Sequence, residues 1–63
     1  MILSKDKVLV AMSNKVMSIT QLHHVSGVGK NTISRILNNR TKPRPTTAGK
    51  LAKALGVKVE DLI

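Results

Sequence analysis

The side chains with the most useful chemistry in this sequence are crowded into the short stretch that follows Gly29. This stretch carries Lys30, Asn31 and Arg35, and it contains no acid. An arginine can donate two hydrogen bonds to guanine O6 and N7, an asparagine can pair bidentately with adenine, and a lysine can reach guanine or a phosphate. Each good bidentate contact discriminates between bases by about 1–3 kcal/mol. These residue types therefore favour contact with the edges of base pairs.

The charges of the chain are strongly one-sided. The formal net charge is +8, from 11 lysines and arginines against 3 acids. Between Lys7 and Val59 every charged residue is basic, and the acids Asp6, Glu60 and Asp61 lie near the two ends. A surface that serves only solubility usually mixes both signs. A field of one sign instead favours a phosphate backbone as the partner.

The sequence offers little support for enzymatic or metal-dependent chemistry. There is no cysteine, so disulfides and thiolate metal sites are excluded. The adjacent His23 and His24 would point to different faces of a helix, and they lack a third ligand. The segment GVGKNT is not a phosphate-binding loop, because His24 and Asn31 occupy positions where that loop needs Gly and Ser or Thr. We expect no enzyme, no cofactor, no metal and no small-molecule substrate.

Two further absences narrow the class of partner. The chain has no aromatic residue, so the bases of single strands have nothing to stack on, and duplex DNA is favoured. The sequence contains no run of about 18 apolar residues that could cross a membrane, and it lacks a recognisable secretion signal. We therefore expect a cytoplasmic protein.

Helices must position the basic and amide side chains. Apolar residues recur at helical spacing, and no segment alternates with a period of two. A chain of 63 residues makes one domain at most, so we expect a single domain over 1–63. The expected fold class is all-α, with five short helices at about 4–14, 18–26, 30–37, 46–55 and 58–62.

The sequence also predicts the inward residues of two of these helices and the loop that precedes the fourth. The first helix is expected to turn Leu9, Met12 and Val16 inward, since they follow helical spacing. Before the fourth helix, Pro43 and Pro45 predict a loop that cannot be helical. The inward residues of that fourth helix are expected to be Ala48, Leu51, Ala52 and Leu55.

The second and third helices are predicted to form a helix-turn-helix over about 18–38. Ser18 and Gln21 have the spacing of a capping box, which begins a helix, and Gly27 permits the sharp turn that ends it. The two helices are expected to be locked together by Leu22, Val28, Ile33 and Ile36. The second helix of the pair would then be free to enter a major groove.

The sequence GVGKNTISRILNNRTKPRPTTAGKLAKALGVKVEDLI resembles the lambda-repressor-like family of helix-turn-helix proteins, which includes the Cro, CI and XRE-type regulators. The shared pattern is Gly-Val, a short polar run, Ile-Ser-Arg-Ile, a basic loop with proline, and a helix that ends in Ala-x-x-Leu-Gly-Val. The resemblance covers nearly the whole chain. It implies a compact five-helix domain that binds a pseudo-palindromic operator as a dimer.

The resemblance also implies which residues touch DNA. It places base contacts at the start of the third helix and one turn further on, at Gly29, Lys30, Asn31, Thr32, Ser34 and Arg35. Phosphate contacts, which position a protein without reading sequence, would come from the following loop, at Asn38, Asn39, Arg40, Thr41, Lys42 and Arg44. Ser18, at a helix N-terminus, can also present backbone N–H groups to a phosphate.

Three positions depart from the family pattern. Ile19 stands where the family often has a glutamine that contacts phosphate, and an isoleucine side chain cannot make that contact. His23 stands where a small alanine is common, and we expect it to be partly buried. Met12 and Leu37 replace an arginine–glutamate pair together, which avoids stranding a buried charge, and we expect the two side chains to touch.

Two functions remain open at this point. The first is a sequence-specific regulator of transcription that binds double-stranded DNA, of the phage Cro-like repressor type. The alternative is a protein-interaction module, an anti-repressor or antitoxin component that keeps the fold but binds a partner repressor. Substitution of Arg35 would separate them, because only the first needs that side chain. Dimerisation is expected on a small surface near the fifth helix, around Val57, Val59, Leu62 and Ile63, and a dimer that forms only on DNA is one of the alternatives.

Overall fold

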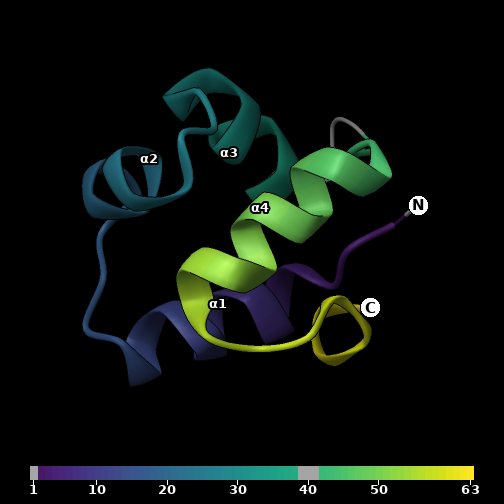
Figure 1. Cartoon of the computed structure of the whole chain (residues 1–63), viewed down its shortest axis with the longest axis horizontal. Coiled ribbons are helices and arrows are strands. Elements are labelled where there is room, and N and C mark those ends of the chain that lie inside the picture. Colours follow the sequence, from purple (N-terminus) through teal and green to yellow (C-terminus); the bar gives the residue numbers. More distant parts are fainter. Residues whose placement is uncertain (1, 39–41) are drawn as a thin grey trace.

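The computed structural model describes residues 2–38 and 42–63, and within them all the regular secondary structure is helical (Figure 1). The elements in chain order are α1 (Lys5–Asn14), α2 (Ile19–Ser26), α3 (Lys30–Leu37), α4 (Pro45–Leu55) and the short 3-10 helix η1 (Val59–Leu62). The expected all-α fold class is confirmed. The fifth helix differs from the expectation, because it is one turn of 3-10 helix and only four helices are α-helical.

The helices enclose one apolar core. Figure 1 shows α4 running across the middle, with α2 and α3 on one side and α1 and η1 on the other. Contacts join α2 to α3 and α4, α1 to α3 and η1, and α4 to η1. The buried side chains are all apolar in the described residues: Leu3, Val8, Ala11, Met12, Leu22, Val28, Ile33, Ile36, Leu37, Pro43, Ala48, Leu51, Ala52, Leu55 and Leu62. Across residues 2–38 and 42–63 every helix is too short or too polar to cross a bilayer.

The inward face of α1 differs from the one expected. Val8, Ala11 and Met12 are buried, whereas Leu9 is 39% exposed and Val16 is 86% exposed. Of the expected stripe only Met12 is correct. The spacing of Val8, Ala11 and Met12 fits a helix as well as the predicted set does, and α1 ends at Asn14 before it reaches Val16.

The connection between α1 and α2 contains an unusual backbone conformation. Val16 has a φ of 51°, in the left-handed region. A β-branched side chain is strained there, because its Cβ crowds the neighbouring carbonyl. The N–H of Met17 donates to the carbonyl of Met12 (2.9 Å), and this hydrogen bond closes the turn that contains Val16 at the end of α1.

Proline is accommodated at the start of α4, and this corrects the expectation that Pro45 lies in a non-helical loop. Pro45 is the first residue of the helix, where the N–H that proline lacks would have no partner within the helix. Ala48, Leu51, Ala52 and Leu55 are buried as predicted.

The C-terminal turn is tied to the beginning of α1. The N–H of Ser4 donates to the carbonyl of Leu62 (2.6 Å), and Lys7 Nζ donates to the carbonyl of Ile63 (2.7 Å). Leu62 itself is only 1% exposed. The expectation that Leu62 contributes to a dimer surface is therefore wrong, because its side chain fills the core of its own domain.

Candidate nucleic-acid interface

The α2–α3 pair begins with a complete capping box. The N–H of Gln21 donates to Ser18 Oγ (3.2 Å), and the N–H of Ser18 donates to Gln21 Oε1 (2.9 Å). At the other end Gly27, with a φ of 76°, terminates α2 in the left-handed conformation that glycine adopts without a Cβ penalty. Both expectations for the limits of α2 are confirmed, and they fix the direction in which the chain enters the turn.

The turn between α2 and α3 is held by packing and by one hydroxyl group. Leu22 and Ile33 are at most 1% exposed, and Val28 is buried between the two helices. Ser26 Oγ donates to the carbonyl of Leu22 (2.5 Å) and accepts from the N–H of Val28 (3.1 Å). The buried positions agree with the prediction, whereas the bridging role of Ser26 had no signal in the sequence.

His23 forms a second bridge across the same turn. Its ring is half-buried, as predicted, and Nδ1 lies 2.7 Å from the carbonyl oxygen of Val28. Since a carbonyl can only accept, Nδ1 must carry the hydrogen. The ring of His24 lies 5.1 Å from that of His23, but no group of three metal-ligating side chains occurs among the described residues.

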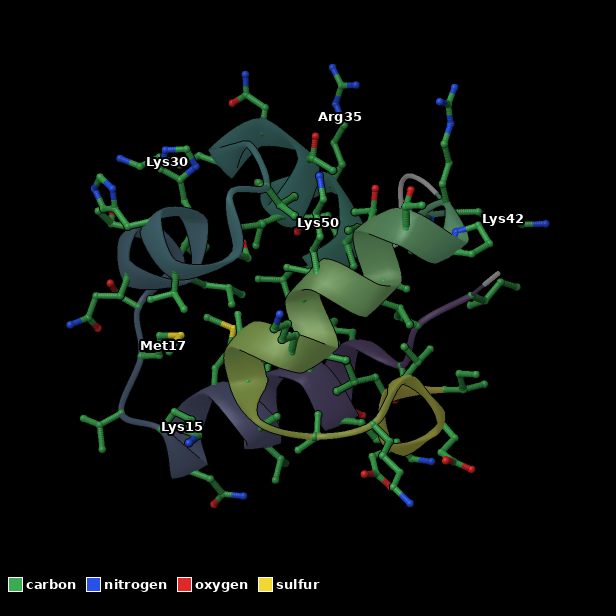
Figure 2. All side chains as sticks on the ribbon, in the orientation of Figure 1. Lys15, Met17, Lys30, Arg35, Lys42 and Lys50 are labelled. Carbon is green, nitrogen blue, oxygen red and sulfur yellow. The ribbon has the colours of Figure 1, made fainter. Side chains whose placement is uncertain are left out.

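Helix α3 is divided sharply into a buried and an exposed face. Ile33, Ile36 and Leu37 are buried, at 1%, 3% and 8% exposure. Gly29 is the N-cap of α3. The predicted base-contacting residues are all exposed: Gly29, Lys30, Asn31, Thr32, Ser34 and Arg35. In Figure 2 Arg35 projects from α3 away from the body of the domain, whereas Lys30 is seen over α2. The fold thus places these polar side chains together on one rigid element.

The residues expected to contact phosphates lie at both ends of this arrangement. Ser18 is exposed at the N-terminus of α2, and Asn38 is exposed where α3 ends. Lys42 and Arg44 are exposed beside the buried Pro43, which anchors the chain before α4. Lys42 points outward in Figure 2. The remaining three candidates, Asn39, Arg40 and Thr41, lie outside the described residues.

Lys50 is a cation near this surface that the sequence did not single out. It is exposed on α4, and Figure 2 shows its side chain directed toward α3. Its charge was visible in the sequence, but the direction of its side chain relative to α3 depends on how α4 packs, and no local pattern encodes that.

Of the other departures from the family pattern, Met12 and Leu37 fit the environment they occupy, whereas Ile19 is an exposed apolar residue. Ile19 is 37% exposed, so its side chain is partly covered at the start of α2. Met12 and Leu37 are both buried in the core, where α1 packs against α3. Direct contact between those two side chains stays a prediction.

Comparison with known proteins agrees with this geometry. Residues 16–62 match a protein-family model described as helix-turn-helix. The chain is also 38% identical over 58 residues to the uncharacterized HTH-type transcriptional regulator YvzC of Bacillus subtilis (strain 168). That similarity covers 92% of this chain and 75% of the relative. No solved structure matches the chain significantly.

Proposed function

The chain belongs to the XRE-type helix-turn-helix family of transcriptional regulators, and from this premise we propose that it is a small repressor of the phage Cro type. Membership of the family makes it a regulator that binds double-stranded DNA and not an enzyme. The proposal adds the mode of reading, the assembly and the sign of regulation.

The proposed reading element is α3, inserted into the major groove. The observation that carries this is the division of α3 into a buried apolar face and an exposed face with Lys30, Asn31 and Arg35. Arg35 is proposed to bind guanine and Asn31 to bind adenine, because their side chains match those base edges. The full proposed set of base contacts is Gly29, Lys30, Asn31, Thr32, Ser34 and Arg35.

Phosphate contacts are proposed on both sides of α3. Ser18 would offer the backbone N–H groups at the start of α2 to one strand. The segment after α3 would follow the backbone through Asn38, Asn39, Arg40, Thr41, Lys42 and Arg44. Such contacts fix the register of α3 in the groove and leave the choice of sequence to the base contacts.

We further propose that 1–63 acts as one domain and binds a pseudo-palindromic operator as a homodimer. A single α3 reads only a few base pairs, and two-fold symmetry in the protein is matched by two-fold symmetry in the site. After the exclusion of Leu62, the apolar residues near η1 that remain accessible are Ile63, at 54% exposure, and the half-buried Val57 and Val59.

Selection of bound sites from random duplexes tests these points together. Purified protein is mixed with a randomised duplex library, and the retained sequences are determined over several rounds. We expect two inverted half-sites whose centres lie about one helical turn, 34–36 Å, or a multiple of it apart. Failure to enrich any sequence at low salt would overturn the proposed reading by α3. Enrichment of one half-site alone would overturn the dimer.

The alternative function, a protein-interaction module that does not read DNA, can be tested with a variant of the same protein. Family membership and the exposed face of α3 both favour DNA. An Arg35→Ala variant that still regulates its target in cells, with no change in the sites it occupies, would restore the alternative.

A further inference from the structure

A surface away from α3 combines exposed apolar groups with positive charge. Val25, on α2, is 62% exposed and lines two hollows, one of about 230 Å³ and one of about 410 Å³. Lys15, Val16 and His24 line the smaller hollow with it, and Lys53 of α4 lines the larger one. We call these five residues the Val25 surface. None of them belongs to the helix that is proposed to read DNA.

The backbone conformation of Val16 indicates that this surface is not arranged for the stability of the free protein alone. Its backbone is held in the left-handed region, at a φ of 51°, although it is not glycine. Its side chain is 86% exposed, so packing within the chain does little to offset the unfavourable conformation. Residues held in sparsely populated conformations concentrate at binding sites, where a partner can make use of them.

The charges around the Val25 surface select the partner. Lys15 and Lys53 flank the valines, and the residues that line the two hollows include no acid. All 3 acids of the chain lie elsewhere, at Asp6 in α1 and at Glu60 and Asp61 in η1. A basic partner would be repelled here and an acidic one attracted.

A phosphate backbone satisfies only half of this chemistry. Phosphates would pair with the lysines, but a charged oxygen does not stabilise an exposed valine side chain. Valine is stabilised when it is removed from water by packing against other apolar groups. We therefore propose that the Val25 surface docks an acidic amphipathic segment of a partner protein, whose apolar side chains enter the hollows beside Val25 and whose carboxylates face Lys15 and Lys53.

The Val25 surface lies next to the proposed DNA interface but is distinct from it. Lys50 also lines the larger hollow, and in Figure 2 it points toward α3. Ser26, whose hydroxyl holds the turn before α3, lines the same hollow, so the Val25 surface borders the helix-turn-helix at that turn. A protein docked there would lie beside the DNA, as a partner recruited to an occupied operator must.

A designed peptide tests the proposal directly. The probe is a short fluorescent peptide that forms an amphipathic helix, with leucines along one face and glutamates along the other. Its binding to the full chain is measured by anisotropy. We expect Val25→Ser to weaken binding by about tenfold, as removal of a valine from an apolar contact implies. Val10→Ser is the matched control, because Val10 is 59% exposed on α1, and it should leave binding unchanged.

A second peptide separates apolar docking from charge attraction alone. In it the leucines are replaced by serines and the glutamates are kept. We expect it to bind at least about tenfold more weakly than the first. Equal binding of the two peptides, or equal binding by the wild type and Val25→Ser, would overturn the proposal.

Backbone amide shifts in NMR spectra then locate the contact. The leucine–glutamate peptide should shift the amides of Val16, Val25 and Lys53 and leave Arg35 unaffected, while a duplex oligonucleotide should do the reverse. Shifts by duplex DNA centred on Val25 would assign the surface to DNA instead and overturn the inference. Val25→Ser should bind duplex DNA as the wild type does. Loss of DNA binding by the wild type itself would bear only on the proposed function.

Discussion

Arg35 and Lys42 are both exposed cations, but they are expected to contribute to DNA binding in different ways. Arg35 lies on α3 and is proposed to read guanine, whereas Lys42 precedes α4 and is proposed to hold a phosphate. Arg35→Ala should therefore cost about 1–3 kcal/mol on the selected operator and relax the preference at one base pair. Lys42→Ala should weaken binding to all duplexes alike.

The measurement is a set of binding titrations on the selected operator and on single-base variants of it. Each protein serves as the control for the other, because both changes remove one positive charge. A uniform loss of affinity for all duplexes with Arg35→Ala would contradict its assignment to a base.

Val16 offers a test of backbone strain at a single residue. Val16→Gly should raise the free energy of unfolding by about 1 kcal/mol, because glycine adopts a positive φ without the Cβ penalty. Val10→Gly is the control. Val10 is similarly solvent-exposed but lies within α1, where glycine costs a few tenths of a kcal/mol relative to valine.

Thermal unfolding followed by circular dichroism measures both. For a domain of this size, 1 kcal/mol corresponds to a change in melting temperature of about 4–8 °C. The two variants should move in opposite directions. A melting temperature for Val16→Gly at or below that of Val10→Gly would show that the left-handed conformation of Val16 carries no strain.

At the scale of the helices, glycine has two opposite roles in this chain. Gly27 ends α2 with a φ of 76°, whereas Gly49 lies inside α4, and an added Cβ would meet nothing within 4 Å at either position. Gly27→Ala should therefore lower the free energy of unfolding by about 1–2 kcal/mol, through the backbone alone. Gly49→Ala should raise it by about 0.5–1 kcal/mol, because alanine favours a helix.

Urea unfolding of both variants is the appropriate measurement, with DNA binding as a second readout for Gly27→Ala. Since the Gly27 turn sets the direction of α3, operator affinity should fall further than the loss of folded protein explains. Gly49→Ala should bind the operator as the wild type does. A stabilised Gly27→Ala protein would mean that α2 can end without a left-handed residue.

Three limits of the helices were predicted correctly from local chemistry, whereas the start of α4 at Pro45 was not. The capping box of Ser18 and Gln21, the turn at Gly27 and the end of α4 at Gly56 are each encoded within a few residues, and the structure has all of them. The inward face of α4 was predictable for the same reason, since its apolar residues repeat at one helical spacing.

Features set by packing between helices were not predictable in the same way. The sequence of α1 allows more than one apolar stripe, and only the contact with α3 and η1 selects Val8 over Leu9. Leu62 is buried because η1 packs against both α1 and α4, which no local pattern in the sequence encodes. On the candidate interface, the exposed face of α3 followed from helical spacing, whereas the direction of Lys50 relative to α3 required the full packing.

For the molecule as a whole, the distribution of charge follows the arrangement of the helices. The 3 acids lie at the beginning of α1 and in η1. In Figure 1 η1 and α3 lie on opposite sides of α4. The basic residues of α3 and of the chain before α4 are therefore not offset by nearby carboxylates, and the field at the proposed interface stays positive. Such a field attracts a polyanion from a distance and weakens as salt is added.

This field leads to a prediction for the dimer on its operator. We expect about six to eight phosphates to be neutralised, because each copy offers Arg40, Lys42 and Arg44 after α3, with Lys30 as a fourth cation. Each contact releases condensed counterions and contributes about −0.9 to the slope of log K against log salt, so a slope near −5 to −7 is expected. Lys42→Ala removes one proposed contact from each copy and should make the slope less steep by about 2.

Titrations across a range of salt concentrations measure both slopes. A wild-type affinity that hardly changes with salt would mean that the positive face of the molecule does not meet the DNA backbone. An unchanged slope in the variant would remove only Lys42 from the contact set.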